Sequence, residues 1–270
     1  MTSILTNNGA MVALQTLQSV NNNLEETQNQ ISTGKEVGMA KDNSAVWAIS
    51  KSMESDISAY ESVSDSLDFG QATVAVASAG IEQIVETLKE MRDLAISATS
   101  QNVDFATIEA SLVEKRAQVE SIIDSASFND ANLLDDAVTT QLDVLGGLDP
   151  ANDLITITSL DSATNLDTGS MTSISDVSTA ATALTEIDTM LAYAIGEAAT
   201  FGASSNRLED QGEFVSKLTD SLKSGVSTMT DTNMEEASAR LKALQTQQQL
   251  AVQSLSIANQ APSTLQQLFR

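Results

Sequence analysis

Two groups of carboxylates are the residues of this chain whose types and spacing suggest chemistry. Asp149, Asp153 and Asp161 offer oxygen ligands of the kind that calcium takes, and Glu235 and Glu236 form an adjacent pair of acids. The aspartates lack the DxDxDG pattern and the glutamate at position 12 of a calcium-binding loop, which favours a solvated acidic loop. The two glutamates stand at the start of an apolar periodic segment, where acids stabilise the positive end of a helix. Neither group predicts a metal site or a catalytic site.

Histidine and cysteine are both absent from the 270 residues. Their absence removes the usual general base and zinc ligand, the Ser-His-Asp and HExxH sites, thiolate metal sites and disulfides. The phosphate-binding patterns of the P-loop and GxGxxG types are also missing. We therefore expect no catalytic, cofactor-binding or metal-binding residues, and no enzymatic activity.

The chain is strongly acidic, with 37 acidic and 13 basic side chains and a formal net charge of −24. Nucleic acids and anionic membranes both require clustered Lys and Arg, so neither is expected as a partner. No stretch approaches the ~20 apolar residues that a membrane span needs. Residues 1–24 lack the basic start and the continuous apolar run of a cleaved signal peptide. If the protein leaves the cell, it uses a route that reads another signal.

Charged side chains are missing from both ends of the chain. There is none from Met1 to Leu24 and none from Ala243 to Phe269, although both segments keep regularly spaced apolar residues among Gln, Asn, Ser and Thr. Free termini usually fray in water and tolerate charge. Ends that exclude charge and keep an apolar period are therefore predicted to be buried against other protein, as an assembly surface.

Apolar residues recur at spacings of three and four along most of the chain, which predicts long helices. The spacing continues from Val46 to Ala95, a helix of roughly 75 Å at 1.5 Å per residue, and this length indicates coiled-coil packing. A break near 33–43 separates it from an N-terminal helix, and a third helix is expected at about 104–126. The heptad core positions of the N-terminal helix are Ala10, Leu14, Leu17, Asn21, Leu24, Gln28 and Ile31.

The periodicity changes between about 138 and 176. Leu142 and Val144 alternate with polar neighbours, as do Ile155 and Ile157, and glycines and a proline separate the two runs. This pattern predicts a β-hairpin with an irregular loop. The following Ser/Thr/Asp-rich segment, 159–185, is expected to be exposed.

Helical spacing resumes from Leu184 to Val226, and a break near 227–233 precedes a last helix that Pro262 ends or lies just beyond. The core positions of this last helix are Met234, Ala237, Leu241, Leu244, Gln248, Ala251, Leu255 and Ala258.

Asn21, Gln28 and Gln248 are polar residues at heptad core positions. Three interpretations fit them: polar residues tolerated in the core at a cost in stability, residues that specify the register of the helices, or the lining of a hydrated channel. Trp47 is expected to pack at the start of the long helix.

The expected fold is mainly α, with long antiparallel coiled-coil helices folded back as a hairpin and a small β-hairpin insert. The layout is symmetric about the insert: uncharged helix, break, long helix, then long helix, break, uncharged helix. The terminal helices should pair as one unit and the inner helices as another.

Ordered motifs at both ends add to this interpretation. The N-terminal ones include Asn23-Leu24, Ile31-Ser32-Thr33-Gly34 and Lys41-Asp42-Asn43. The C-terminal ones include Gly202-Ala203, Asn206-Arg207-Leu208, Met234–Leu241, Gln247–Leu250, Ser254–Gln260 and Leu268-Phe269-Arg270. Through these motifs Thr2–Ile49 and Asp176–Arg270 closely resemble bacterial flagellin, most of all the short flagellins of alphaproteobacteria. With the long helices included, the resemblance covers about 230 residues, and only the middle insert lies outside it.

The resemblance implies three regions. Residues 1–44 with 228–270 would form a D0-like terminal helix pair, 45–137 with 177–227 a D1-like helical bundle, and 138–176 the β-hairpin and a short variable insert. It also implies a structural subunit that polymerises through its terminal helices into the flagellar filament for swimming motility. The alternatives are a flagellin-like hook–filament junction protein and a coiled-coil protein secreted by a type III system.

The partners that the resemblance implies are copies of the same chain, the flagellar cap and hook–filament junction proteins, an export chaperone and the flagellar type III apparatus. The expected localisation is extracellular, in the flagellar filament. The predicted assembly interface comprises Leu14, Leu17, Leu24, Ile31, Met234, Leu241, Leu244, Ala251, Leu255, Ala258, Leu268 and Phe269.

Overall fold

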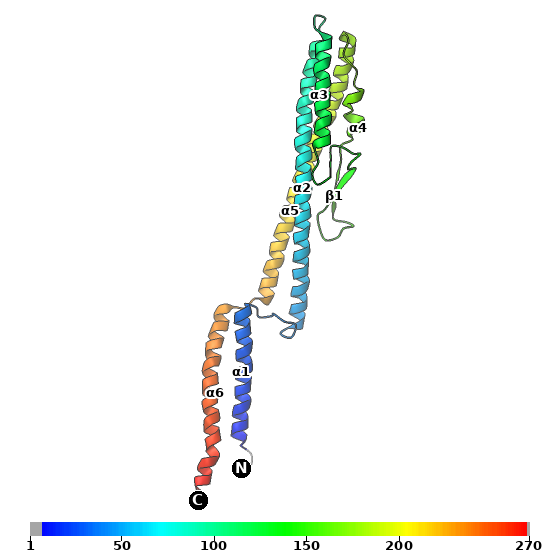
Figure 1. The fold of residues 1–270 in the computed structure, drawn as a ribbon. Helices are drawn as coiled ribbons and strands as arrows, with labels where there is room; N and C mark the ends of the chain where they lie inside the picture. The colour runs from blue at the N-terminus through cyan, green and yellow to red at the C-terminus, as the bar shows by residue number, and fades with distance from the viewer. Residues whose placement is uncertain (1–6, 269–270) are drawn as a thin grey trace. The chain divides into compact units, whose positions relative to one another are not determined.

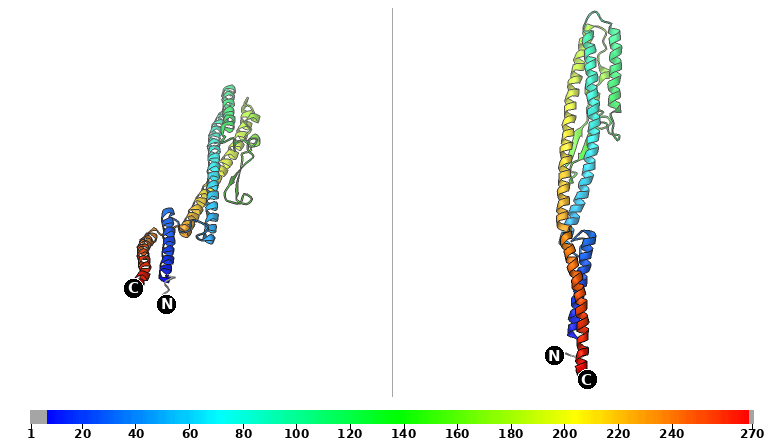
Figure 2. Two further views of the ribbon diagram at one scale, coloured as in Figure 1. Left: turned by 60° about the horizontal axis from the view of Figure 1, so that its bottom comes forward. Right: turned by 90° about the vertical axis from the view of Figure 1, so that its left-hand side faces the viewer.

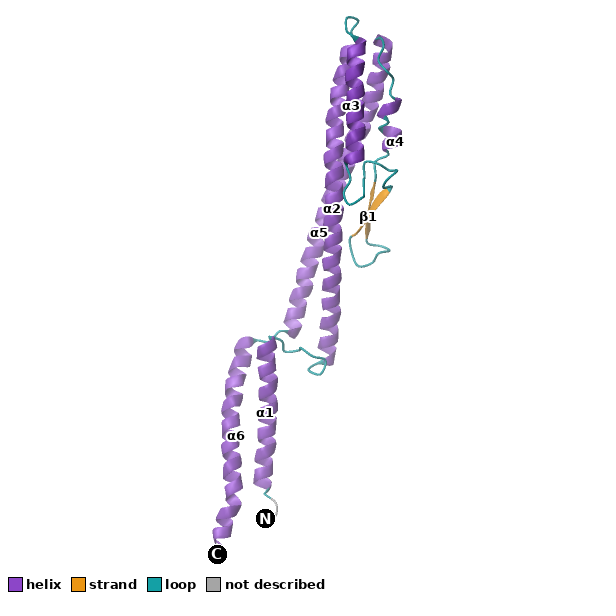
Figure 3. Ribbon diagram, viewed as in Figure 1, coloured by secondary structure: helices purple, strands orange, loops and turns teal. Residues whose placement is uncertain are grey.

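The structure, a computed structural model, describes residues 7–268, with the side chains of residues 7–260. The chain forms two compact units, one made of Met1–Asp56 and Ser221–Arg270 and the other of Ile57–Asp220. The boundaries fall inside the two longest helices, α2 (Ser44–Ala98) and α5 (Val177–Thr230), whose outer ends belong to the first unit. The mainly helical fold and the small sheet (Figure 3) agree with the expectation from the sequence.

The first unit is built on an antiparallel pair, α1 (Asn8–Thr33) and α6 (Met234–Leu268), which lie side by side (Figures 1 and 2). Gly34 ends α1 in the left-handed conformation, with φ of 70°, a position that glycine occupies without steric cost. The breaks predicted near 33–43 and 227–233 lie between the helices, at 34–43 and 231–233.

The last helix does not end at Pro262, which corrects the prediction; α6 continues to Leu268. A proline inside a helix has no N–H to donate to the carbonyl four residues earlier, here that of Ala258. This carbonyl accepts a hydrogen bond of 2.7 Å from Asn7 Nδ2 on the neighbouring chain segment. The same Asn7 caps α1, because its side-chain oxygen accepts from the Ala10 N–H at 3.1 Å.

The second unit is a bundle of α2, α5 and a third helix, α3 (Phe105–Ser125). The long helices α2 and α5 run antiparallel (Figure 1). The predicted apolar spacing of α2 lines the core from Val63 onward, whereas Ile49 near the start of the helix is exposed. The buried residues are Val63, Leu67, Val74, Ala77, Ile81, Ile84, Leu88, Met91 and Ala95. From α5 the core receives Ala180, Ala183, Ile187, Ala194, Phe201, Leu208 and Val215. Small and large residues are interspersed along these helices, and the core is a long seam between them.

The β-hairpin is present as predicted, formed by β1 (Gln141–Leu145) and β2 (Leu154–Thr158). Val144 pairs with Ile155 and Leu142 with Ile157, so one face of the hairpin is apolar. Three of these four side chains are buried in the core of the second unit, and Leu142 packs against it. The hairpin is thus attached to the helices by one face.

The segment after the hairpin corrects another expectation, since much of it is buried. It contains a short helix, α4 (Ser162–Asn165), and a 3-10 turn at Thr168–Ser170, and it buries Leu160, Leu166, Met171 and Ile174. Carboxylates of the flanking helices hold its backbone: the Ile174 N–H donates to Glu109 at 2.7 Å and the Thr172 N–H to Glu186 at 2.8 Å. α5 then begins at Val177.

Candidate assembly interface

The seam between α1 and α6 contains most of the side chains that the sequence assigned to assembly. On α6, Ala237, Leu244 and Ala251 are buried, in the heptad register predicted. Half-buried beside them are Leu17, Leu24, Ile31, Leu241, Leu255 and Ala258. Within a single chain, these residues pack the two terminal helices against each other.

The register of α1 differs from the prediction at every second core position. The seam takes Ala13, Val20 and Thr27, each one residue before the expected Leu14, Asn21 and Gln28, which are exposed. Thr27 is buried, and its hydroxyl is hydrogen-bonded, because Oγ1 donates to the Asn23 carbonyl at 2.8 Å.

Two of the polar residues predicted at core positions, Asn21 and Gln248, bond to each other at the edge of the seam instead of being buried in it. Gln248 Nε2 donates to Asn21 Oδ1 at 2.8 Å, a hydrogen bond between the two helices at the exposed edge of their seam. Gln248 is half-buried and Asn21 is exposed. The pair fixes one helix against the other while its members stay accessible to water.

A second set of apolar residues on the terminal helices is exposed. On α1 these are Met11, Val12 and Leu14, and on α6 Leu250, Val252 and Ile257, with exposed fractions from 47% to 65%. Except for Leu14, the sequence prediction missed them, because they lie outside the heptad core positions. The signal that identifies them is the lack of charge on the helix faces around them.

Three predicted interface residues remain. Met234, at the first turn of α6, is 46% exposed. Leu268 is the last residue of α6, and Phe269 lies outside the described residues. Of the predicted residues whose side chains the structure describes, eight lie in the seam within the chain, and Leu14 and Met234 are exposed.

The first turn of α6 also carries Glu235 and Glu236. The side chain of Asn233 caps it, because its oxygen accepts from the N–H groups of Glu235 at 3.1 Å and Glu236 at 3.4 Å. Both glutamates are exposed next to the positive end of the helix.

The three candidate calcium ligands make local hydrogen bonds instead. The side chain of Asn152 and the N–H of Ala151 both donate to the carboxylate of Asp149. These hydrogen bonds, first that of Asn152 and then that of Ala151, lower the pKa of the Asp149 carboxyl. Asp153 accepts from the Asp149 N–H, and Asp161 caps α4 by accepting from the Thr164 N–H. Within residues 7–268, no three acids are placed to hold a metal ion.

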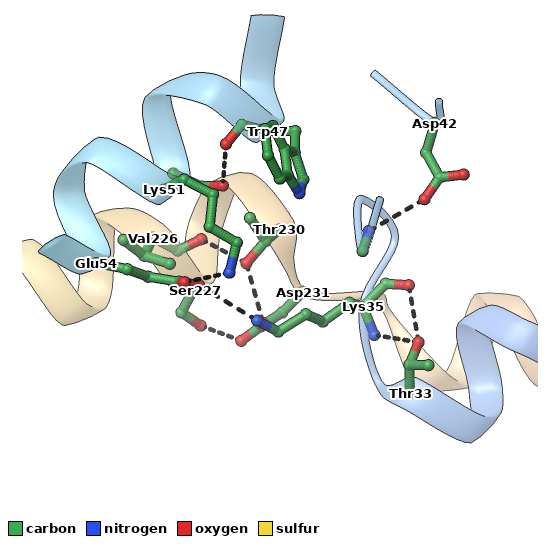
Figure 4. A network of polar contacts seen from close by, with 12 residues as sticks. Thr33, Lys35, Asp42, Trp47, Lys51, Glu54, Val226, Ser227, Thr230 and Asp231 are labelled. Carbon is green, nitrogen blue, oxygen red and sulfur yellow. Dashed lines mark hydrogen bonds and ion pairs between the residues drawn. The ribbon is translucent and has the colours of Figure 1, made fainter. Parts of the chain in front are cut away.

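Polar contacts surround the two breaks of the first unit, and Figure 4 shows the network of side chains among them. Backbone hydrogen bonds join the two breaks directly. The Thr230 carbonyl accepts from the N–H groups of Glu36 at 2.7 Å and Val37 at 3.3 Å, and the Gly34 carbonyl accepts from the Thr232 N–H at 2.9 Å. The Thr230 hydroxyl is buried and donates to the Val226 carbonyl at 2.8 Å. The segment after α1 is thereby bonded to the end of α5.

An ion-pair cluster lies beside these backbone contacts. Glu54 on α2 binds Lys51, three residues earlier, and Lys35 of the break at 3.4 Å. The hydrogen bond from Lys51 is the largest cause that lowers the pKa of Glu54, and the positive charges of Lys51 and Lys35 act in the same direction. Trp47 is half-buried near this cluster at the start of α2, where the sequence placed it.

Comparison with known protein families shows which family this architecture belongs to. Residues 4–139 match the family model described as the bacterial flagellin N-terminal helical region, and residues 184–269 match the bacterial flagellin C-terminal helical region. The chain belongs to the bacterial flagellin family. The matches include α1, α2 and α6 and most of α5, and they leave out residues 140–183, which contain both strands of the hairpin, the segment that follows it and the first turns of α5.

Flagellins of similar length align with nearly the whole chain. A flagellin of Brucella melitensis is 40% identical over 282 residues, covering 100% of both chains, and the flagellin FljM of Caulobacter vibrioides is 38% identical, covering 99% of this chain and 98% of that one. The crystal structure of Bacillus cereus flagellin matches with a TM-score of 0.50 and 25% identity, covering 54% of this chain and 86% of that chain. The protein is a structural subunit of the flagellar filament. None of the helices in the described part of the chain is both long enough and apolar enough to cross a membrane.

Proposed function

We propose that this flagellin polymerises through the exposed apolar faces of its terminal helices, with the α1–α6 seam providing the rigid pair that presents them. The observation that carries the proposal is the combination of large exposed apolar side chains with helix faces free of charge. Such faces are costly in water and mark sites of protein association. The seam residues contribute by holding α1 and α6 together, and Leu14 and Met234 belong to the exposed set.

The regional organisation follows from this proposal. Residues 1–44 and 228–270 act as the D0-like assembly pair, 45–137 and 177–227 as the D1-like bundle, and 138–176 as the insert. Export through the flagellar type III apparatus with a chaperone, an extracellular location, and contact with the cap and hook–filament junction proteins complete the proposal. The protein acts as a structural subunit without enzymatic activity.

A charge placed on the exposed apolar face tests the proposal. Val252→Asp should leave the helicity of the monomer unchanged, because Val252 is 53% exposed. In the polymer the carboxylate would lose water without gaining a partner, a cost of several kcal/mol, so the critical concentration should rise at least about 100-fold. Circular dichroism of the purified protein measures the helicity, and sedimentation with negative-stain microscopy measures the critical concentration.

Val138→Asp is the matched control, since Val138 is 59% exposed in the second unit, outside the terminal helices. It should polymerise as the unmodified chain does. Filaments of Val252→Asp at the normal critical concentration would refute the assembly face. An unmodified chain that forms only short rings would favour the junction protein, and one that stays monomeric under all conditions would favour the secreted coiled-coil protein.

A further inference from the structure

Charges of opposite sign border the two charge-free segments. Glu25 and Glu26 on α1 follow the uncharged segment Met1–Leu24, and Arg240 and Lys242 on α6 precede the uncharged segment Ala243–Phe269. Each helix therefore changes from charged to uncharged within a few residues. Two acids border the uncharged part of α1, and two bases border the uncharged part of α6.

The packing of α1 against α6 brings these four residues to the same level. The hydrogen bond between Asn21 and Gln248 and the backbone bridge between Lys35 and Asp231 fix the alignment on either side of them. Five residues on from Asn21 is Glu26, and six residues back from Gln248 is Lys242. At 1.5 Å per residue, the acids and the bases lie within about one helical turn of each other along the pair.

All four side chains remain available to another molecule. Glu25, Glu26, Arg240 and Lys242 are exposed, and within the described part of the chain none of them forms an ion pair. The two glutamates also line an open hollow of about 560 Å³ between α1 and the break that follows it. Lys35 and Lys41 of the same chain line this hollow too, and its open side leaves room for incoming side chains to reach the carboxylates.

We propose that these residues form ion pairs between copies of this chain: Glu25 and Glu26 of one copy bind Arg240 and Lys242 of the next. The acids and bases occupy different helices, and when the acids of each copy bind the bases of the next copy without the reverse pairing, the contact is heterologous. Such a heterologous contact extends into an open polymer, whereas a self-complementary patch closes into a dimer. The inference rests on the proposed function, because the uncharged faces next to these residues must already bring the copies together.

The role of the pairs is to set which copy faces which, rather than to supply most of the association energy. Exposed ion pairs contribute little individually, but like charges brought together at an interface are strongly unfavourable and exclude wrong registers. The four charges lie where the apolar faces end, so a copy that slipped along its neighbour by one or two turns would oppose uncharged residues or charges of the same sign.

Two charge-inverted variants and their mixture test the proposal. E25K/E26K carries only bases at this level, and R240E/K242E only acids. Each variant alone should have a critical concentration at least about tenfold higher than the unmodified chain, because like charges meet at every contact. An equimolar mixture should polymerise near the normal critical concentration, into filaments that contain both variants, since each basic copy then binds acidic neighbours.

The control is E209K/D210K, which makes the same change of charge at two adjacent exposed acids on α5. It should polymerise at least as readily as the unmodified chain, and a rise in its critical concentration as large as that of E25K/E26K would overturn the proposal in favour of net charge. Normal polymerisation of both inverted variants would also overturn it. So would a quadruple swap E25K/E26K/R240E/K242E that polymerises while the mixture does not, because the pairs would then act within one copy. Failure of the unmodified chain to polymerise would instead refute the proposed function.

Discussion

Gly70, in the middle of α2, determines how closely the β-hairpin approaches the helix. A Cβ atom at this position would lie 2.5 Å from Val144 Cγ2 and 2.9 Å from Cγ1 of the same side chain. Val144 is buried and β-branched, so its side chain has little freedom to move away. The close contact explains why a glycine is found inside a helix, where it is intrinsically unfavourable.

We expect Gly70→Ala to lower the free energy of unfolding of the chain by about 1–3 kcal/mol, the usual cost of overpacking a core. Urea unfolding followed by circular dichroism measures it. The control is Gly212→Ala on α5, where no atom lies within 4 Å of the added Cβ. There the substitution should stabilise by about 0.5–1 kcal/mol, because alanine favours the helix. Equal effects of the two variants would show that the hairpin does not pack on Gly70 as described.

The carboxylate of Glu54 on α2 forms ion pairs with Lys51 and with Lys35, which lies in the break after α1. Because its pKa is lowered in the folded chain, the ionised carboxylate is the favoured form there. Its contribution to stability is therefore present above the pKa of the unfolded carboxyl and is lost as the pH falls through the lower, folded pKa. The contacts between α2 and the break should weaken in that acidic window.

We expect Lys51→Met to raise the pKa of Glu54 toward its ordinary value, since it removes the largest cause of the shift. Carboxyl-detected NMR titration of the monomer measures this pKa directly. Lys89→Met is the matched control, because Lys89 forms an ion pair at 3.3 Å with Glu86, far along the chain from Glu54. A Glu54 pKa that is the same in the Lys51→Met variant and the unmodified chain would contradict the assignment.

At the scale of the elements, the long helices, the breaks and the hairpin could be predicted from the sequence, because each has a periodic or turn signal of its own. The buried heptad residues of α2, from Val63 to Ala95, and those of α6, from Ala237 to Ala251, are where the spacing placed them. A long apolar stripe leaves little choice of face, so local pattern and tertiary packing agree.

The register of α1 could not be fixed in this way, since its composition is nearly as apolar on one flank as on the other. Leu14 and Ala13 both suit a core position by type, and Thr27 suits burial only once its hydroxyl bonds to the Asn23 carbonyl. The choice is made by contacts with α6, including the bond between Asn21 and Gln248. These contacts join residues more than two hundred positions apart and leave no local trace in the sequence.

Two further elements depended on contacts of the same kind. The segment around Thr172 has the composition of an exposed loop, and its burial rests on Glu109 and Glu186 of two helices that accept from its backbone. The extension of α6 past Pro262 was also unexpected, and Asn7 supplies the donor that the proline lacks. In each case a polar partner distant in sequence satisfies backbone groups that local reasoning would leave to water.

At the scale of the whole molecule, charge and apolar exposure are separated along the chain. The net charge of −24 arises from the residues between Leu24 and Ala243, together with Arg270, while the charge-free segments hold the exposed apolar faces. Assembly through those faces brings the acidic parts of many copies close together. The proposed pairs between Glu25, Glu26, Arg240 and Lys242 involve only four charges per copy and offset a small part of this repulsion.

Polymerisation should therefore become more favourable as salt is added. Repulsion between exposed charges extends over a Debye length of about 30 Å at 0.01 M ionic strength and about 8 Å at 0.15 M, so salt removes most of the long-range term. The short-range ion pairs weaken too, but they are fewer than the unpaired acids. We expect the critical concentration, measured by light scattering and sedimentation, to fall steadily with NaCl over this range. The variant E209Q/D210N, with two fewer negative charges per copy, should show a smaller dependence on salt. A critical concentration that rises with NaCl would mean that attraction between opposite charges, rather than repulsion among the acids, controls assembly.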